Sequence, residues 1–167
     1  DNTVLAPIVY TSFESGSARK TATANVKSVV AEWVAAANSY SSEADKVKVI
    51  HDTIANNVDY NNDFINMSSS EQTTAEQSLY TQSAYSVFCT DLTVCAGYAQ
   101  AFEMVCNGAG IDCVAVTSSN HEWNKVRVND SWYNVDVTWD DSTSAVYYTY
   151  YGRNDDYYDT VSVYSAT

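Results

Sequence analysis

The sequence predicts an α+β fold in a single domain, with helices first and consecutive strands after them. Apolar residues recur at helical spacing in the first half of the chain, whereas short β-rich segments dominate from residue 111 onward. Helices followed by a run of strands favour an α+β protein over a doubly wound one, in which the two would alternate. A length of 167 residues with 46% hydrophobic residues is enough for one substantial core.

Two amphipathic helices are expected near the N-terminus. Residues 1–20 contain proline and glycine and should be irregular, whereas residues 21–40 carry valine, tryptophan and alanine at helical spacing. Ser41 or Ser42 is a candidate cap for the second helix, which should run to about Asn57. Both helices present one apolar face, so both are expected to pack on the core.

The middle of the chain is predicted to contain a loop and a third helix. Residues 59–77 are polar and indicate a long loop, a type of segment that is often functional in compact domains. The third helix is expected to start near Cys95, with Thr93 as its candidate cap, and to end at Asn107 and Gly108.

Strands are expected from residue 111 to the C-terminal region. Residues 111–117 are rich in β-formers, and a hairpin should follow around a two-residue turn at Asn129 and Asp130. The tyrosine-rich residues 146–151 are a candidate for one more strand.

Composition restricts the partners and the compartment. The net charge of −13 argues against nucleic acid and anionic membrane surfaces as partners. No apolar run approaches the roughly 20 residues of a membrane span. Lysine is scarce while Ser, Thr, Asn and Tyr are abundant, which points to an exported protein; no signal peptide is visible, so this would be its mature form. We expect a monomer, secreted or at the cell surface.

The four cysteines do not suggest a metal site. No C-x-x-C pair occurs and only two histidines are present, so no cofactor or metal is expected. The helix–turn–strand path should bring Cys106 and Cys113 together, which makes them the preferred disulfide, with Cys89 left free. Reduced thiols throughout are the alternative.

Cys95 carries the sharpest chemical signal. At the start of a helix, unpaired N–H groups and the helix dipole favour the thiolate, the nucleophilic form of cysteine. Cys95, Ala99, Phe102 and Cys106 would share one helical face that packs on the sheet. The alternative is that Cys95 is only a small buried apolar residue, as most free cysteines are.

The hairpin can present a histidine beside an aspartate. A two-residue turn makes His121 and Asp136 diagonal neighbours on one face, roughly 7–8 Å apart between backbones. A three-residue turn would place them on opposite faces. Such a carboxylate fixes the tautomer of a histidine, which can then take the proton of a thiol. Alone, His121 could equally be a polar strand end and Asp136 an edge charge.

The tryptophans and the remaining charged residues have separate interpretations. Trp123 and Trp132 should form walls on the catalytic face, and Trp139 should lie in the core. His51, in the second helix, is interpreted as structural. The acidic pairs 140–141 and 155–156 lack EF-hand spacing and are interpreted as solvated surface.

Several segments resemble the transglutaminase-like superfamily of cysteine enzymes. The matching stretches lie within residues 40–160. They include the helix that leads into Asn56-Asn57-Val58-Asp59-Tyr60, the segment Ser83-Ala84-Tyr85, Val94-Cys95-Ala96-Gly97-Tyr98-Ala99-Gln100-Ala101-Phe102, His121-x-Trp123-Asn124, and Trp132-Tyr133-x-Val135-Asp136-x-Thr138-Trp139-Asp140. The chain is more similar to bacterial members than to animal cross-linking enzymes. It departs from the family at Ser86-Val87-Phe88-Cys89, Glu122 and Ser131, which affects the cleft and not the triad.

The resemblance implies a papain-like α+β fold and a Cys–His–Asp triad. Cys95 would be the nucleophile, His121 the base and acid, and Asp136 the orienting residue. The expected domain covers residues 1–167, with 1–40 as an N-terminal extension and helix and 41–160 as the catalytic core.

The function expected from this triad is acyl transfer through a thioester on a peptide or side-chain amide, as a peptidase or amidase. The alternatives are a cross-linking transglutaminase with an amine acceptor, or a non-catalytic surface module that uses the cleft for binding. The substrate would be a protein or peptide, which could be associated with the cell wall. The Cys95 backbone N–H should form part of the oxyanion hole. Tyr60 and Gln82 are candidates for the second donor and the substrate cleft.

Overall fold

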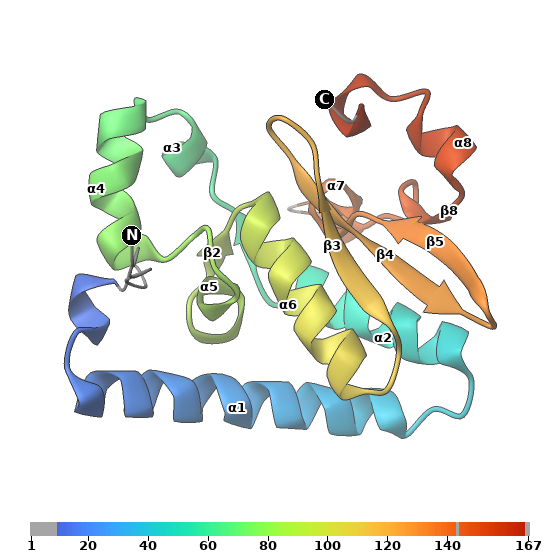
Figure 1. Cartoon of the computed structure of the whole chain (residues 1–167), viewed down its shortest axis with the longest axis horizontal. Coiled ribbons are helices and arrows are strands. Elements are labelled where there is room, and N and C mark those ends of the chain that lie inside the picture. The colour runs from blue at the N-terminus through green and yellow to red at the C-terminus, as the bar shows by residue number, and fades with distance from the viewer. Residues whose placement is uncertain (1–9, 143, 166–167) are drawn as a thin grey trace, which may run out of the picture.

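The computed structural model describes residues 10–142 and 144–165 and has the predicted α+β architecture (Figure 1). The helices are η1 Thr11–Phe13, α1 Gly16–Asn38, α2 Glu43–Ala55, α3 Asn62–Ile65, α4 Ser69–Leu79, α5 Ala84–Cys89, α6 Cys95–Gly108, α7 Val137–Asp140, α8 Asp155–Tyr158 and η2 Ser162–Tyr164. The strands are β1 Asp59–Tyr60, β2 Leu92–Thr93, β3 Cys113–Thr117, β4 Glu122–Val128, β5 Ser131–Val135, β6 Asp141–Ser142, β7 Ala145–Val146 and β8 Tyr151–Arg153.

A four-stranded antiparallel sheet in the order β3-β4-β5-β8 forms one layer of the molecule. The two-residue turn is confirmed, because Val128 pairs with Ser131 across it. Asn129 and Asp130 have φ angles of 49° and 64°, the left-handed pair that a type I′ hairpin turn requires. Of the tyrosine-rich segment 146–151, only its ends lie in strands, β7 and β8.

Helix α6 packs against this sheet and forms the centre of the core (Figure 1). The predicted apolar face is confirmed for Ala99, Phe102 and Cys106, which are buried. Cys95, at the N-terminal end of the helix, is half-buried. Helices α1 and α2 pack on α6, so α6 lies between the sheet and the N-terminal helices. Its first turn is thereby held by packing on several sides.

The helix boundaries differ from the predictions in two places. Helix α1 begins at Gly16, earlier than predicted, because the Ser15 side chain caps it by accepting a hydrogen bond from the Ala18 N–H. For α2, Ser42 is the N-cap, as one of the two predicted alternatives had it. Thr93 does not cap α6: the N-cap is Val94, and the Thr93 hydroxyl instead donates to the carbonyl of Thr81.

The predicted long loop at residues 59–77 is wrong. This segment contains β1, α3 and most of α4. Helix α4 starts with a capping box. The side chains of Ser68 and Glu71 each accept a hydrogen bond from the backbone N–H of the other residue. The helix was missed because it has no buried residue and therefore no apolar periodicity.

The four cysteines are free thiols in this structure, so the preferred disulfide is not formed. The predicted proximity holds, since the Cys106 and Cys113 side chains are hydrogen-bonded and both are buried. Within residues 10–142 and 144–165, no helix is long and apolar enough to cross a bilayer.

Candidate active site

Cys95 is the first residue of α6 and follows the two-residue strand β2. Its backbone N–H is one of the helix-terminal donors that have no partner within the helix. Close packing at Gly97 supports this position. A Cβ atom added at Gly97 would lie 1.9 Å from the Thr93 hydroxyl oxygen and collide with it. Glycine is therefore required where α5 and β2 meet the start of α6, and this contact fixes the direction of the helix.

His121 lies just before β4, at the end of the loop from β3, and only 8% of its surface is exposed. Its ring is flanked by the indoles of Trp123 and Trp139, with ring centroids 6.2 and 5.6 Å away. The Trp123 indole is itself anchored, because its N–H donates to Asn134 Oδ1. These contacts leave the imidazole little freedom to rotate.

Asp136 is fully buried at the N-cap of α7 and holds His121 in place. Its Oδ2 accepts a hydrogen bond from His121 Nε2 at 2.6 Å. The same oxygen accepts a hydrogen bond from the Tyr164 hydroxyl at 2.7 Å. The other oxygen, Oδ1, accepts one from the backbone N–H of Trp139 at 3.2 Å. Because Nε2 is occupied, Nδ1 is the ring nitrogen that remains available to the Cys95 thiol.

The charges around His121 favour its protonated form. Burial alone lowers the pKa of His121, but the hydrogen bond to Asp136 and the interaction with the neighbouring Cys95 side chain outweigh it. The pKa of His121 consequently rises to about 9. An imidazolium beside a thiol is the arrangement in which a cysteine can be activated as a nucleophile.

Of the candidate residues Tyr60 and Gln82, Tyr60 lies at the start of α6, and Gln82 is exposed at the surface. Tyr60 pairs with Thr93 in the short parallel β1–β2 ladder, which brings it to the start of α6. Burial raises the pKa of Tyr60 to about 12, and the nearby Cys95 and Asp136 add to the rise. Gln82 is exposed, and no hydrogen bond within the described residues joins its side chain to Cys95 or His121.

The tryptophan predictions were correct only in part. Trp123 stacks on His121 as expected but is buried beneath Tyr158 and Tyr164, so it supports the base from behind. Trp132 is 49% exposed and pairs with Arg127 near the turn, far along the hairpin from His121, so it does not line the site. Trp139 is 39% exposed and contacts His121, instead of lying in the core, because α7 replaces the predicted end of the strand.

The C-terminal tyrosines form a part of the site that was not predicted. Tyr164 donates to Asp136 and packs on Trp123 and Trp139, while Tyr158 packs on Tyr164 with ring centroids 4.0 Å apart. Both rings are buried. The abundance of tyrosine in the sequence was the available signal, but it does not identify which tyrosine reaches Asp136.

A second histidine–aspartate pair lies at the other end of α7. His51 is fully buried, with Nδ1 3.0 Å from Asp52 and Nε2 3.3 Å from Asp140. Asp140 is also fully buried, so its prediction as solvated surface is wrong. Asp141 is half-buried and accepts from the Tyr98 hydroxyl, whereas Asp155 is exposed and pairs with Lys125.

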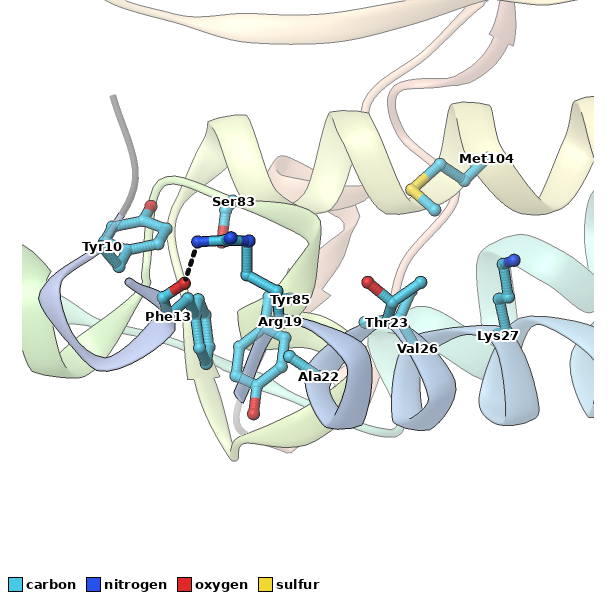
Figure 2. A pocket seen from close by; sticks show the side chains of 10 residues that line it. All are labelled: Tyr10, Phe13, Arg19, Ala22, Thr23, Val26, Lys27, Ser83, Tyr85 and Met104. Atoms are coloured by element: carbon cyan, nitrogen blue, oxygen red, sulfur yellow. Dashed lines mark hydrogen bonds between the residues drawn. The ribbon is translucent and has the colours of Figure 1, made fainter. Parts of the chain in front are cut away.

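Two cavities in the molecule differ in the chemistry of their linings. A cavity of about 490 Å³ opens beside Tyr60 and Trp139 and has a lining of polar and apolar surface in similar amounts. The other, of about 450 Å³, lies between the start of α1 and α5, with apolar side chains and with Arg19 bonded to the carbonyl of Phe13 (Figure 2). The apolar cavity includes none of the triad candidates. Among the described residues, no cluster of three or more His, Cys, Asp or Glu side chains could hold a metal ion.

Among the solved structures compared with this chain, one with a TM-score above 0.5 supports the fold. A crystal structure of a TGase aligns with a TM-score of 0.59 and 18% identity, over 78% of this chain and 35% of that one. A candidate cysteine protease from Cytophaga hutchinsonii aligns at 0.39 with 23% identity over 56% of this chain, and a candidate protease from Parabacteroides distasonis at 0.44 with 19% identity over 73%. The alignments cover 30% and 26% of those two chains, so this chain spans about a third or less of each of the three.

The family assignment comes from the sequence. No curated protein matches this chain. The core model of the transglutaminase-like superfamily matches residues 27–137, which is more than half of the chain. That range includes Cys95, His121 and Asp136 together with the helix and hairpin that position them. The chain therefore belongs to the transglutaminase-like superfamily.

Proposed function

We propose that the protein is a cysteine-dependent peptidase or amidase that acts through a thioester intermediate. The observation that carries the proposal is the hydrogen bond between His121 and a fully buried Asp136, with Cys95 beside the imidazole at the head of α6. A buried carboxylate, an imidazole and a thiol in this order are the parts needed to activate a cysteine nucleophile.

The first half of the reaction is acylation. The Cys95 thiolate attacks the carbonyl carbon of an amide, and the negative oxygen that forms points toward the Cys95 N–H at the start of α6. Tyr60 is the second candidate donor, because it lies beside Cys95 at the start of α6 and its phenol is a neutral O–H donor at neutral pH. The C–N bond then breaks, and the imidazolium of His121 gives its proton to the leaving amine.

The second half of the reaction is deacylation. His121, now neutral, takes a proton from a water molecule, whose oxygen attacks the thioester carbonyl carbon. The C–S bond breaks, the carboxylic acid leaves and Cys95 returns to its starting form. Throughout, Asp136 keeps the ring orientation fixed and stabilises the imidazolium. A primary amine in place of water would give the cross-linking reaction, the alternative outcome of the same intermediate.

A non-catalytic binding module is the competing function, and the state of Cys95 separates the two. The test is iodoacetamide labelling at pH 7, followed by mass spectrometry of each cysteine-containing peptide. Cys95 should react much faster than an ordinary free thiol. Cys89 is a matched control within the same molecule, because it is also partly exposed but burial raises its pKa. A Cys95 that reacts no faster than a free thiol would contradict the proposal.

The acceptor and the compartment require their own measurements. A peptide-library digest with wild type and Cys95→Ala should show cleavage that only the wild type produces, whereas cleavage common to both excludes Cys95 as its cause. Ammonia release with incorporation of an amine into a glutamine peptide would instead identify a transglutaminase. We also propose that the protein acts outside the cell, on the basis of its lysine-poor composition, which is rich in Ser, Thr, Asn and Tyr. Fractionation of the source cells tests this.

A further inference from the structure

The cavity beside the candidate active site has no role in the steps described so far. It lies between β1, α3, α7 and β6 and has a volume of about 490 Å³. Its lining includes Asp59, Tyr60, Asn62, Thr138, Trp139 and Asp141. A cavity of this size accommodates a long side chain, because it far exceeds the space of a single water molecule, about 30 Å³.

Two aromatic residues connect this cavity to the nucleophile and the base. Tyr60 is near enough to Cys95 for the thiol to influence its pKa, and the Trp139 ring lies 5.6 Å from the ring of His121. Both side chains also line the cavity. A group bound there is therefore next to the position of the scissile amide.

The cavity carries two carboxylates, one of which, Asp141, accepts a hydrogen bond from the Tyr98 hydroxyl. Asp59 and Asp141 contribute carboxylates, and they lie close enough that Asp59 raises the pKa of Asp141, after the larger effect of burial. Among the described residues, no Lys or Arg lines the cavity. A cation placed between these carboxylates would relieve their repulsion.

Thr138 also lines the cavity, and its hydroxyl is shielded from solvent. Thr138 is only 9% exposed, and its hydroxyl has no hydrogen-bond partner among the described residues. An unpaired buried hydroxyl is costly, so in native proteins it usually finds a partner in a bound molecule or in water. Thr138 lines this cavity, so a change of its side-chain rotamer on binding would bring the shielded hydroxyl to a ligand there, which could then supply the missing hydrogen bond.

The walls favour an organic cation over a metal ion. Tyr60 and Trp139 can pack on an alkyl stem and attract an ammonium or guanidinium group through their ring faces. Calcium and magnesium instead need six or more oxygen ligands, and the described residues contain no cluster of three or more His, Cys, Asp or Glu side chains that could hold them.

We propose that this cavity is a specificity subsite that binds the cationic side chain of a lysine or arginine flanking the scissile amide of the substrate. This inference rests on the proposed amide-cleaving function and adds a substrate preference to it. Asp59 and Asp141 supply the charge, Thr138 a hydrogen bond, and the two aromatic rings the contact with the stem.

The test compares four peptides of the form acetyl-Ala-Ala-X-Ala-Ala-amide. X is lysine, norleucine with the same stem but no charge, diaminopropionate with the charge on a short stem, or glutamate. The kcat/KM for lysine should exceed that for norleucine by about tenfold, as expected for one cation–π contact and partly exposed ion pairs. Lysine should also exceed diaminopropionate, which separates this subsite from general attraction to an acidic protein. Equal values for lysine and norleucine, or for lysine and diaminopropionate, overturn the proposal.

Variants assign the preference to the cavity. Asp59→Asn should lower the ratio of kcat/KM for the lysine peptide to kcat/KM for the norleucine peptide by about threefold to fivefold. The effect is moderate because an exposed ion pair contributes less than a buried one. Thr138→Val, which keeps the shape of the buried side chain, should lower it as well. Asp63→Asn removes the same charge from a neighbouring exposed position outside the cavity and should leave the ratio unchanged. A ratio that falls equally in Asp59→Asn and Asp63→Asn contradicts the proposal.

Binding separates the failure of this proposal from the failure of the proposed function. The Cys95→Ala protein, titrated with the same peptides and followed by ligand-observed NMR, should still bind the lysine peptide more tightly than the other three. If no peptide is cleaved but this preference is present, the subsite stands and the catalytic proposal fails. If peptides are cleaved without any lysine preference in rate or binding, the subsite fails and the catalytic proposal stands. Displacement of the lysine peptide by 1 mM calcium would identify a metal site and overturn the subsite.

Discussion

Two histidine–aspartate pairs lie at opposite ends of the short helix α7, and they differ in what the second ring nitrogen meets. At the N-terminal end, Asp136 holds Nε2 of His121, and the other nitrogen is available to Cys95. At the C-terminal end, Asp140 faces Nε2 of His51, and the other nitrogen meets Asp52. The same residue types thus leave one ring nitrogen free for a reactive group in one place and form a closed link between elements in the other.

The comparison also explains how a four-residue helix can hold a catalytic carboxylate. A helix this short is not stable by itself, because nucleation is costly and few hydrogen bonds reward it. Here Asp136 caps the first turn of α7, and the Asp140–His51 contact ties the last turn to α2. The structural pair therefore contributes to the position of the catalytic pair.

The largest expected effect is on catalysis at the open pair. His121→Ala should reduce kcat/KM for peptide cleavage by roughly 100- to 10,000-fold, the usual range for losing a general acid–base. The measurement is the initial rate on a cleaved library peptide at pH 7. A His121→Ala protein that keeps more than a tenth of the wild-type value would show that the imidazole does not take part.

The closed pair should respond in stability. His51→Ala removes the imidazole that faces the fully buried Asp140 and so takes a polar partner from that carboxyl group, which should reduce the free energy of unfolding by about 1–3 kcal/mol. Urea unfolding followed by circular dichroism gives this value. Iodoacetamide labelling of Cys95 in the folded fraction should remain within about threefold of the wild type.

The matched control for this experiment is His121→Ala in the same unfolding assay. Asp136 keeps two other hydrogen-bond donors, the Tyr164 hydroxyl and the Trp139 N–H, so the loss of stability should be smaller than for His51→Ala. If His121→Ala destabilises the protein more than His51→Ala does, the assignment of one pair to catalysis and the other to structure is wrong.

Tyr164 allows a finer test of the open pair. Tyr164→Phe keeps the aromatic packing but removes a hydrogen bond to a charged carboxylate, which should cost about 1.5–3 kcal/mol of stability. The control is Tyr158→Phe, which removes a bond to the neutral carbonyl of Tyr150 within the same cluster and should cost about 0.5–1.5 kcal/mol. Equal losses in urea unfolding would show that the negative charge of Asp136 does not strengthen the bond.

Local sequence signals were sufficient for two parts of the site. Helix α6 begins at Cys95 where the predicted helix did, because apolar spacing marks its buried face. The register that aligns His121 with Asp136 follows from the turn, since Asn129 and Asp130 tolerate positive φ and alternation decides the rest.

Long-range contacts and short helices were not predictable in the same way. The hydrogen bond from Tyr164 crosses 28 positions of sequence, and no periodicity within the C-terminal segment indicates its partner. Helix α7 was read as the end of a strand because Val135 and Val137 alternate with polar residues, and this error misplaced Trp139. An aspartate at an N-cap is a signal for a helix, but over four residues it competes with an equally good strand pattern.

The pH dependence should reflect the open pair, with an upper limit set by His121. Its pKa is raised to about 9, so the imidazolium that protonates the leaving amine persists well above neutral pH. Above about pH 9, kcat/KM should fall tenfold for each further pH unit as the imidazole loses its proton. Folding stability follows the same sign. The contribution of this group is complete below the ordinary histidine pKa of about 6.5 and is lost as the pH rises through about 9.

The profile of kcat/KM between pH 5 and 11, with cleavage followed by mass spectrometry, measures this limit. Unfolding midpoints at the same pH values separate the loss of activity from the loss of fold. The Tyr164→Phe protein should move the upper limit to higher pH, because Oδ2 of Asp136 then accepts from His121 without a competing donor. An upper limit near pH 6.5 in the wild type would mean that Asp136 does not stabilise the imidazolium, and the two histidine–aspartate pairs would then have to be interpreted alike.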